Sequence, residues 1–163
     1  MLVLAGRFTI DLPIGEGIPI TGQTIAVLLT GVYLNQRHIL IVYAMYLIGG
    51  SMLNMPFFAD GSYGWSKLAG KSGGYLYSFP IAATYMHHLV SKIDISPWLV
   101  LLHGMIATAI ILTIGMLHLS HHIGISSAWT YGVLPYLAGG IIKAVLVTVI
   151  VMLVSYGTTR RDG

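Results

Sequence analysis

Residues 98–119 read WLVLLHGMIATAIILTIGMLHL, and two histidines are the only ionisable side chains among them. Residues 131–156 read YGVLPYLAGGIIKAVLVTVIVMLVSY, in which Lys143 is the only acidic or basic residue. Apolar stretches of about 18 residues or more predict membrane-spanning helices, because a helix satisfies its backbone hydrogen bonds internally across about 30 Å of hydrocarbon. Only 8% of the 163 residues are charged, whereas soluble domains have about 25%. We therefore predict an all-α, polytopic membrane helix bundle in contact with the lipid bilayer.

Glycine, proline and polar clusters divide the rest of the chain into shorter apolar segments. The predicted helices cover residues 22–34, 39–53, 73–90, 98–119 and 132–155. Residues 1–6 are typical of the end of a truncated first helix, which brings the expected number to about six in one transmembrane domain over residues 1–163. The polar segments 7–21, 54–72 and 120–130 are predicted to be loops that meet at one end of the bundle, where a ligand would enter.

Basic residues lie mainly in the short turns and in the C-terminal tail, at Arg37, Lys92, Arg160 and Arg161. By the positive-inside rule, this distribution places the C-terminus in the cytoplasm and the long loops outside a plasma membrane. The net charge of +3 is small, so it does not favour a nucleic-acid partner. The chain has no cysteine, which excludes disulfides and thiolate metal sites.

Two lysines are candidates for binding an anion. Lys143 interrupts an apolar span, where an ammonium group costs about 2.5–3.5 kcal/mol and normally faces a polar interior. Snorkelling toward the outer surface is the alternative reading of Lys143. Lys71 precedes Gly73 and Gly74 at a predicted helix N-terminus, whose free amides also favour an anion. The two glycines would serve equally well for close helix packing, and the sequence leaves that alternative open.

The seven histidines raise the question of a metal or haem site. His118, His121 and His122 would share a helix face if the helix continued past residue 120, but no carboxylate accompanies them in that span. We therefore predict no metal and no cofactor. No nucleophile–base pair is apparent either, which argues against an enzyme. A small membrane haem or oxidoreductase subunit that uses the histidines is the alternative from another functional class.

Six short motifs follow one another along nearly the whole chain. They are IPITGQT (18–24), YLIGG (46–50), MPFFA (55–59), GKSGGYL (70–76), GVLPYL (132–137) and IKA (142–144). Their order and spacing resemble the BioY family, the biotin-binding S components of energy-coupling factor (ECF) transporters. The resemblance implies a six-helix subunit of a bacterial plasma membrane that binds biotin and pairs with a transmembrane coupling subunit and two ABC-type ATPases. Any ATP hydrolysis would then belong to those partners.

The resemblance also implies roles for individual residues. By this resemblance, Gln23 and Asn54 are expected to make polar contacts to the biotin ring, and Lys71 or Lys143 to bind the carboxylate. The residues expected to line the pocket are Gly73, Gly74 and Tyr75. Gly140 stands where the family usually has an aspartate. Because a lost acceptor for a buried polar ligand costs about 1–3 kcal/mol, an S component for another vitamin is the alternative within transport.

Overall fold

The computed structural model describes residues 1–10, 20–90 and 96–159. Its helices are α1 (Leu2–Ala5), α2 (Gln23–Tyr33), α3 (Gln36–Ser51), α4 (Trp65–Ala69), α5 (Gly73–Val90), α6 (Pro97–Ile123), α7 (Ile125–Gly132) and α8 (Leu134–Thr159), with a 3-10 turn at Ala59–Gly61. Two strands of two residues each, β1 (Thr9–Ile10) and β2 (Ile20–Thr21), pair antiparallel. The molecule is thus a helix bundle with one small hairpin.

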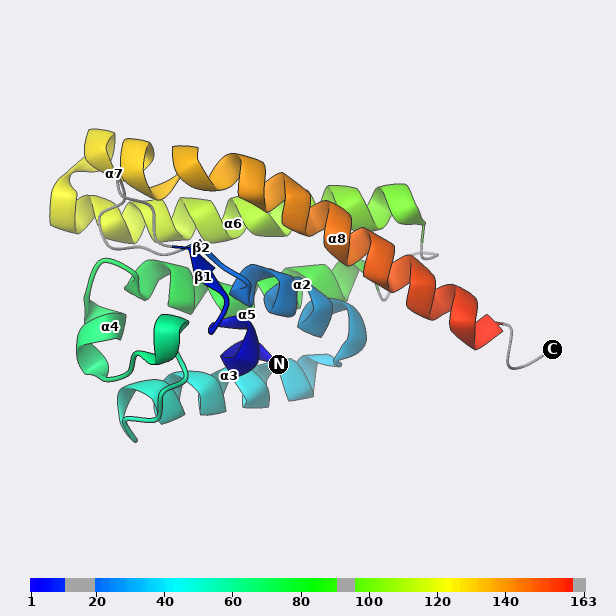
Figure 1. Cartoon of the computed structure of the whole chain (residues 1–163), viewed down its shortest axis with the longest axis horizontal. Coiled ribbons are helices and arrows are strands. Elements are labelled where there is room, and N and C mark those ends of the chain that lie inside the picture. The colour runs from blue at the N-terminus through cyan, green and yellow to red at the C-terminus, as the bar shows by residue number, and fades with distance from the viewer. Residues whose placement is uncertain (11–19, 91–95, 160–163) are drawn as a thin grey trace.

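The longer helices run roughly along a common axis, with α5 and α2 between α3 on one side and α6 and α8 on the other (Figure 1). The short helices α4 and α7 lie at the same end of this bundle, on opposite sides of α5 and α6, and the last turn of α8 projects from the opposite end. The predicted segments 54–72 and 120–130 therefore do lie at one end. Residues 11–19 of the third predicted loop lie outside the described residues.

Small residues bring α2 and α5 close together at the centre of the bundle. A Cβ atom built on Gly31 would lie 2.7 Å from the carbonyl oxygen of Ala83 and 2.6 Å from Cβ of Met86. Val27 and Leu28 of α2 are fully buried. Such close approach at small residues is typical of helix pairs in membranes, where van der Waals packing drives association.

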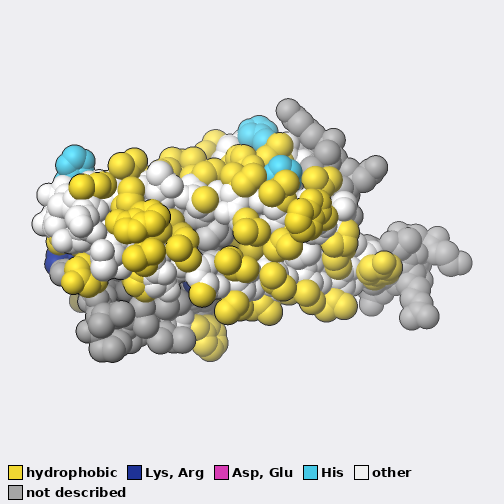
Figure 2. Space-filling model, turned by 90° about the horizontal axis from the view of Figure 1, so that it is seen from above, with side chains coloured by type: hydrophobic (Ala, Val, Ile, Leu, Met, Phe, Trp, Pro, Cys, Tyr) yellow, Lys and Arg dark blue, Asp and Glu magenta, His cyan; other side chains and the backbone are white. Residues whose placement is uncertain are grey.

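Two of the described helices, α6 and α8, are long and apolar enough to cross a membrane, and most of the residues in their apolar windows are not buried inside the structure. Hydrophobic side chains cover most of the face seen in Figure 2. The outward-facing apolar residues of α8 include Ile141, Ile142, Val145 and Leu146. An apolar surface of this extent is typical of a protein whose outer face contacts lipid. By contrast, α2 has 11 residues and a length of about 16 Å, so it spans only part of the hydrocarbon layer.

The predicted helices agree with the observed ones to within a few residues, and the helix over residues 73–90 agrees at both ends. The prediction of a loop over residues 120–130 was wrong. α6 continues to Ile123, and α7 begins at Ile125 after a single residue, Gly124, with φ of 81°. Because a positive φ interrupts a helix locally, one glycine turns the chain here without a loop. Likewise, the predicted loop over 54–72 contains the short helix α4.

Candidate functional site

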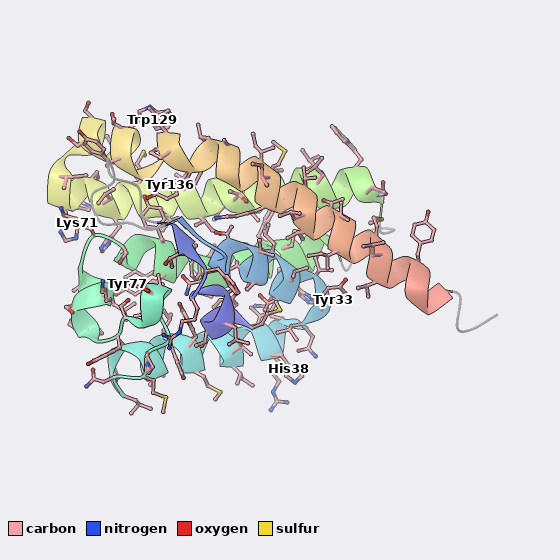
Figure 3. The ribbon with its side chains drawn as sticks, viewed as in Figure 1. Tyr33, His38, Lys71, Tyr77, Trp129 and Tyr136 are labelled. Atoms are coloured by element: carbon pink, nitrogen blue, oxygen red, sulfur yellow. The ribbon has the colours of Figure 1, made fainter. Side chains whose placement is uncertain are left out.

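A cavity of about 210 Å³ lies between α2, α5, α6 and α8, and the segment from Phe58 to Lys67 also contributes to its wall. We call it the central cavity. Part of its wall is apolar, with Phe79, Ile111 and Leu112. Tyr136, another lining residue, lies toward the end of the bundle that carries Lys71 and Trp129, away from Tyr33 and His38 (Figure 3). The central cavity therefore belongs to the end of the bundle that carries α4 and α7.

Gln23 is the polar side chain that α2 brings to the wall of the central cavity at its first turn, and it is 2% exposed. Its Nε2 donates a hydrogen bond to the hydroxyl of Tyr46 at 2.5 Å. Its backbone N–H donates to Oγ1 of Thr21, at the end of β2, at 3.2 Å. The hairpin and α3 thus hold Gln23 from two sides, which fixes a polar group inside an otherwise apolar region.

Tyr75 lines the central cavity from α5, and two glycines make room for it. Its ring lies against Gly115 of α6, where a Cβ atom would overlap the ring. Its hydroxyl donates to the carbonyl oxygen of Gly132 at 2.8 Å, and its ring centroid is 6.5 Å from that of Tyr136. Tyr75 is therefore held at both ends, and together with Tyr136 it forms an aromatic wall suited to a flat ring.

Among the described residues, three charged side chains line the central cavity: Asp60, Lys67 and Lys143. Lys143 is half-buried in α8, whereas Lys67 on α4 and Asp60 in the 3-10 turn are exposed. Asp60 has φ of 55°, an uncommon conformation for a residue other than glycine. The described part of the wall thus has two cations and one anion, and the deeper of the cations is Lys143. This arrangement favours a ligand with an anionic group.

Gly140 and Thr108 face each other across the wall of the central cavity, from α8 and α6. A Cβ atom built on Gly140 would lie 2.8 Å from Cγ2 of Thr108. Oγ1 of Thr108 donates to the carbonyl oxygen of Gly104 at 2.9 Å, so the side chain is held in place. The methyl group of Thr108 therefore lies close to the space that a side chain at position 140 would need.

The structure brings three of the seven predicted site residues together at the central cavity, namely Gln23, Tyr75 and Lys143. The other four do not line it in the structure; they are Asn54, Lys71, Gly73 and Gly74.

Local geometry explains the position of these four residues. Asn54 follows α3 in a turn with φ of 50°, and its side chain is exposed. Lys71 is exposed just before α5. A Cβ atom on Gly73 would collide with the carbonyl oxygen of Leu68, and one on Gly74 would collide with the side chain of His118 on α6. Both glycines thus lie where the chain is tightly packed, and a role of either one in lining the ligand site stays a prediction.

Sequence reasoning did not single out Asp60, Lys67 or Thr108. The two charged residues lie in a polar, glycine-rich segment, in which any charge would be expected to face solvent. Only the path of the chain from α3 to α4 brings them to the cavity. Thr108 lies inside a long apolar helix, and a polar residue within such a span was an available signal.

Two histidines of α6 make contacts within the bundle. His118 is held by the carbonyl oxygen of Gly70, 3.1 Å from its Nε2, and its ring centroid is 5.2 Å from that of His122. Throughout residues 1–10, 20–90 and 96–159, no three histidine, aspartate or glutamate side chains are close enough to share an ion. His118 therefore ties α6 to the turn before α5.

Comparison with known proteins gives a consistent result. A family model described as the BioY family matches residues 1–160. A protein named probable biotin transporter BioY, from Pyrococcus horikoshii, is 32% identical over 133 residues, which are 82% of this chain and 78% of that protein. The biotin transporter BioY of Thermotoga maritima is 29% identical over 160 residues, 93% of each chain. The crystal structure of the S-component for biotin from an ECF-type ABC transporter matches with a TM-score of 0.79 and 22% identity, over 95% of this chain and 85% of that one. This last likeness shows the fold.

Proposed function

The chain belongs to the BioY family of membrane transport proteins, and from this premise we propose that it is the biotin-binding, substrate-specific subunit of an ECF-type transporter. The observation that carries the proposal is the central cavity, which combines a hydrogen-bonding amide, an aromatic wall and a half-buried lysine. Biotin presents matching groups: a flat ureido ring with N–H donors and a carbonyl acceptor, an aliphatic chain, and a terminal carboxylate.

We assign these groups of the ligand to different parts of the wall. The ureido ring would lie near Gln23, whose buried amide requires a polar partner in a ligand that displaces water. The ring and chain would contact Tyr75 and Tyr136. The carboxylate would meet Lys143, because a charge-assisted hydrogen bond in an enclosed site is stronger than one in water.

The relatives support the wider assembly. A solved protein with this fold is an S-component from an ECF-type ABC transporter, so we propose that this chain likewise joins a transmembrane coupling subunit and ATPases that supply the energy. The basic residues of the α2–α3 turn and of the tail support a cytoplasmic C-terminus.

Calorimetric titration of biotin into the detergent-purified chain tests the proposal. We expect saturable binding at a single site and weaker binding of biotin amide, which lacks the carboxylate. If biotin gives neither heat nor a shift of the thermal midpoint, the proposed ligand is wrong. A second test measures uptake of labelled biotin by cells that contain this chain with and without the coupling subunit and ATPases. Uptake that is unchanged by an ATPase variant unable to hydrolyse ATP would contradict the proposed assembly.

A further inference from the structure

Tyr46 of α3 lies directly behind Gln23 and does not itself line the central cavity. Both residues are almost completely buried, with 3% and 2% of their surfaces exposed. The hydroxyl of Tyr46 accepts the hydrogen bond from Nε2 of Gln23 at 2.5 Å. The oxygen of the same amide, Oε1, lies 3.5 Å from Oγ1 of Thr21, and Thr21 does line the central cavity. The nitrogen end of the amide is thus engaged by Tyr46, while the oxygen end accepts from Thr21, a residue of the cavity wall.

The ring of Tyr46 is clamped between two phenylalanines that follow α3. It is stacked on Phe57, with 6.4 Å between the ring centroids and 7° between the planes. Its edge contact with Phe58 has a centroid distance of 5.4 Å. The phenylalanines in turn rest on Gly49 and Gly50, where a Cβ atom would lie 2.5 Å from their rings. Because the ring cannot shift without displacing this layer, the hydroxyl of Tyr46 has a fixed position.

We infer that Tyr46 is a positioning residue of the ligand site: it holds the amide of Gln23 so that the carbonyl oxygen faces N–H donors of the ligand. The inference rests on the proposed function, which supplies such donors in the ureido ring of biotin. Without the hydroxyl, the amide of Gln23 could rotate, and its Nε2 would have no partner. The ligand would then meet an acceptor only part of the time, and affinity would fall although no residue in contact with the ligand had changed.

A double-mutant cycle on biotin affinity tests the inference. Tyr46→Phe keeps the clamped ring and removes the hydroxyl, and we expect it to raise the Kd for biotin roughly three- to tenfold, the effect of one neutral hydrogen bond. In a Gln23→Leu background the same substitution should change the Kd by no measurable factor, because the amide through which Tyr46 acts is gone. Gln23→Met provides the same background if the leucine variant does not fold.

Tyr43→Phe is the matched control, because Tyr43 lies one turn before Tyr46 on α3, is 1% exposed, and shares a hydrogen bond of 2.8 Å with Oγ1 of Thr30. This control also loses one buried hydroxyl, but away from the central cavity, so it should lower the thermal midpoint and leave the Kd unchanged. Equal Kd effects of the Tyr43 and Tyr46 variants would mean general loosening of α3 and would overturn the inference. An unchanged Kd for Tyr46→Phe, or the same loss with and without Gln23, would do so as well. If the unaltered chain does not bind biotin, the proposed function fails first, and the inference fails with it.

Discussion

The contact between Gly140 of α8 and Thr108 of α6 gives a sharp test of how the cavity wall is packed. An added Cβ would lie 2.8 Å from Cγ2 of Thr108, about 0.6 Å inside the 3.4 Å at which ordinary contact begins. Thr108 is β-branched and holds the carbonyl oxygen of Gly104, so it has few positions to move to. Overpacking of this kind costs about 1–3 kcal/mol, and the higher helix propensity of alanine offsets about 0.5–1 kcal/mol. We expect Gly140→Ala to lower the free energy of unfolding by about 1–2 kcal/mol.

The chain offers a matched control and a rescue for this substitution. A Cβ on the neighbouring Gly139 would meet nothing within 4 Å, so Gly139→Ala should be neutral or slightly stabilising. Thr108→Ser removes Cγ2 and keeps the hydroxyl. In that background Gly140→Ala should lose most of its cost. The free energies come from denaturant unfolding in detergent, followed by helical circular dichroism, with thermal midpoints as a check.

Two results would refute this reasoning about Gly140. The first is a Gly140→Ala cost that is the same with threonine or serine at position 108. The second is an equal cost for Gly139→Ala, since that would indicate an effect of the helix backbone and not of the contact. The same geometry governs Gly140→Asp, which also adds a Cβ. We therefore expect an aspartate at position 140 to be accommodated only when Thr108 is replaced as well.

Further substitutions separate the roles of the lysines and of the aromatic wall. Lys143→Gln should raise the Kd for biotin roughly ten- to hundredfold and the Kd for biotin amide far less, because it removes a charge-assisted hydrogen bond. Lys71→Gln is the control in the same titrations, because Lys71 does not line the cavity. Lys67→Gln should lower the association rate constant of biotin about two- to fivefold at low salt and leave its dissociation rate constant unchanged in stopped-flow fluorescence. A changed dissociation rate constant would contradict a position of Lys67 at the exposed edge of the cavity. Gly115→Ala should lower the free energy of unfolding by about 1–3 kcal/mol, because the new methyl group displaces the ring of Tyr75. A crystal structure of the variant with that ring unmoved would disprove the contact.

Apolar runs and their polar interruptions were enough to predict the helices, because membrane-spanning segments must be apolar and internally hydrogen-bonded. The sequence could not predict that residues 120–130 continue as helices around Gly124. Serines, a glycine and a tryptophan are typical of loops, but at the end of the bundle packing outweighs such weak local preferences. The contact between His118 of α6 and the carbonyl oxygen of Gly70 connects parts of the chain at this end. No pattern in the sequence predicts such a side-chain contact.

The candidate site was predictable in the same uneven way. Lys143 was identifiable because a cation inside an apolar span is energetically costly unless it faces a polar interior. The structure places it at the cavity. Gly73 and Gly74 were ambiguous, because a glycine lets either a ligand or a neighbouring helix approach the backbone. Lys67 was not identifiable at all. Its position depends on the turn after α3, which no local pattern specifies.

The different depths of Lys67 and Lys143 imply that the site separates ligand capture from ligand retention. An exposed charge at a rim acts over a distance of about 8–10 Å in physiological salt, so it changes how often an anion arrives and little else. A half-buried charge interacts at lower effective dielectric, so it mainly changes how long the anion stays. Asp60 also lines the cavity and is exposed. Its negative charge opposes the capture of an anion, so the deeper lysine mainly determines the affinity. Removing Asp60 by Asp60→Asn should therefore speed association of biotin, while the difference in dissociation rate between biotin and its amide remains with Lys143.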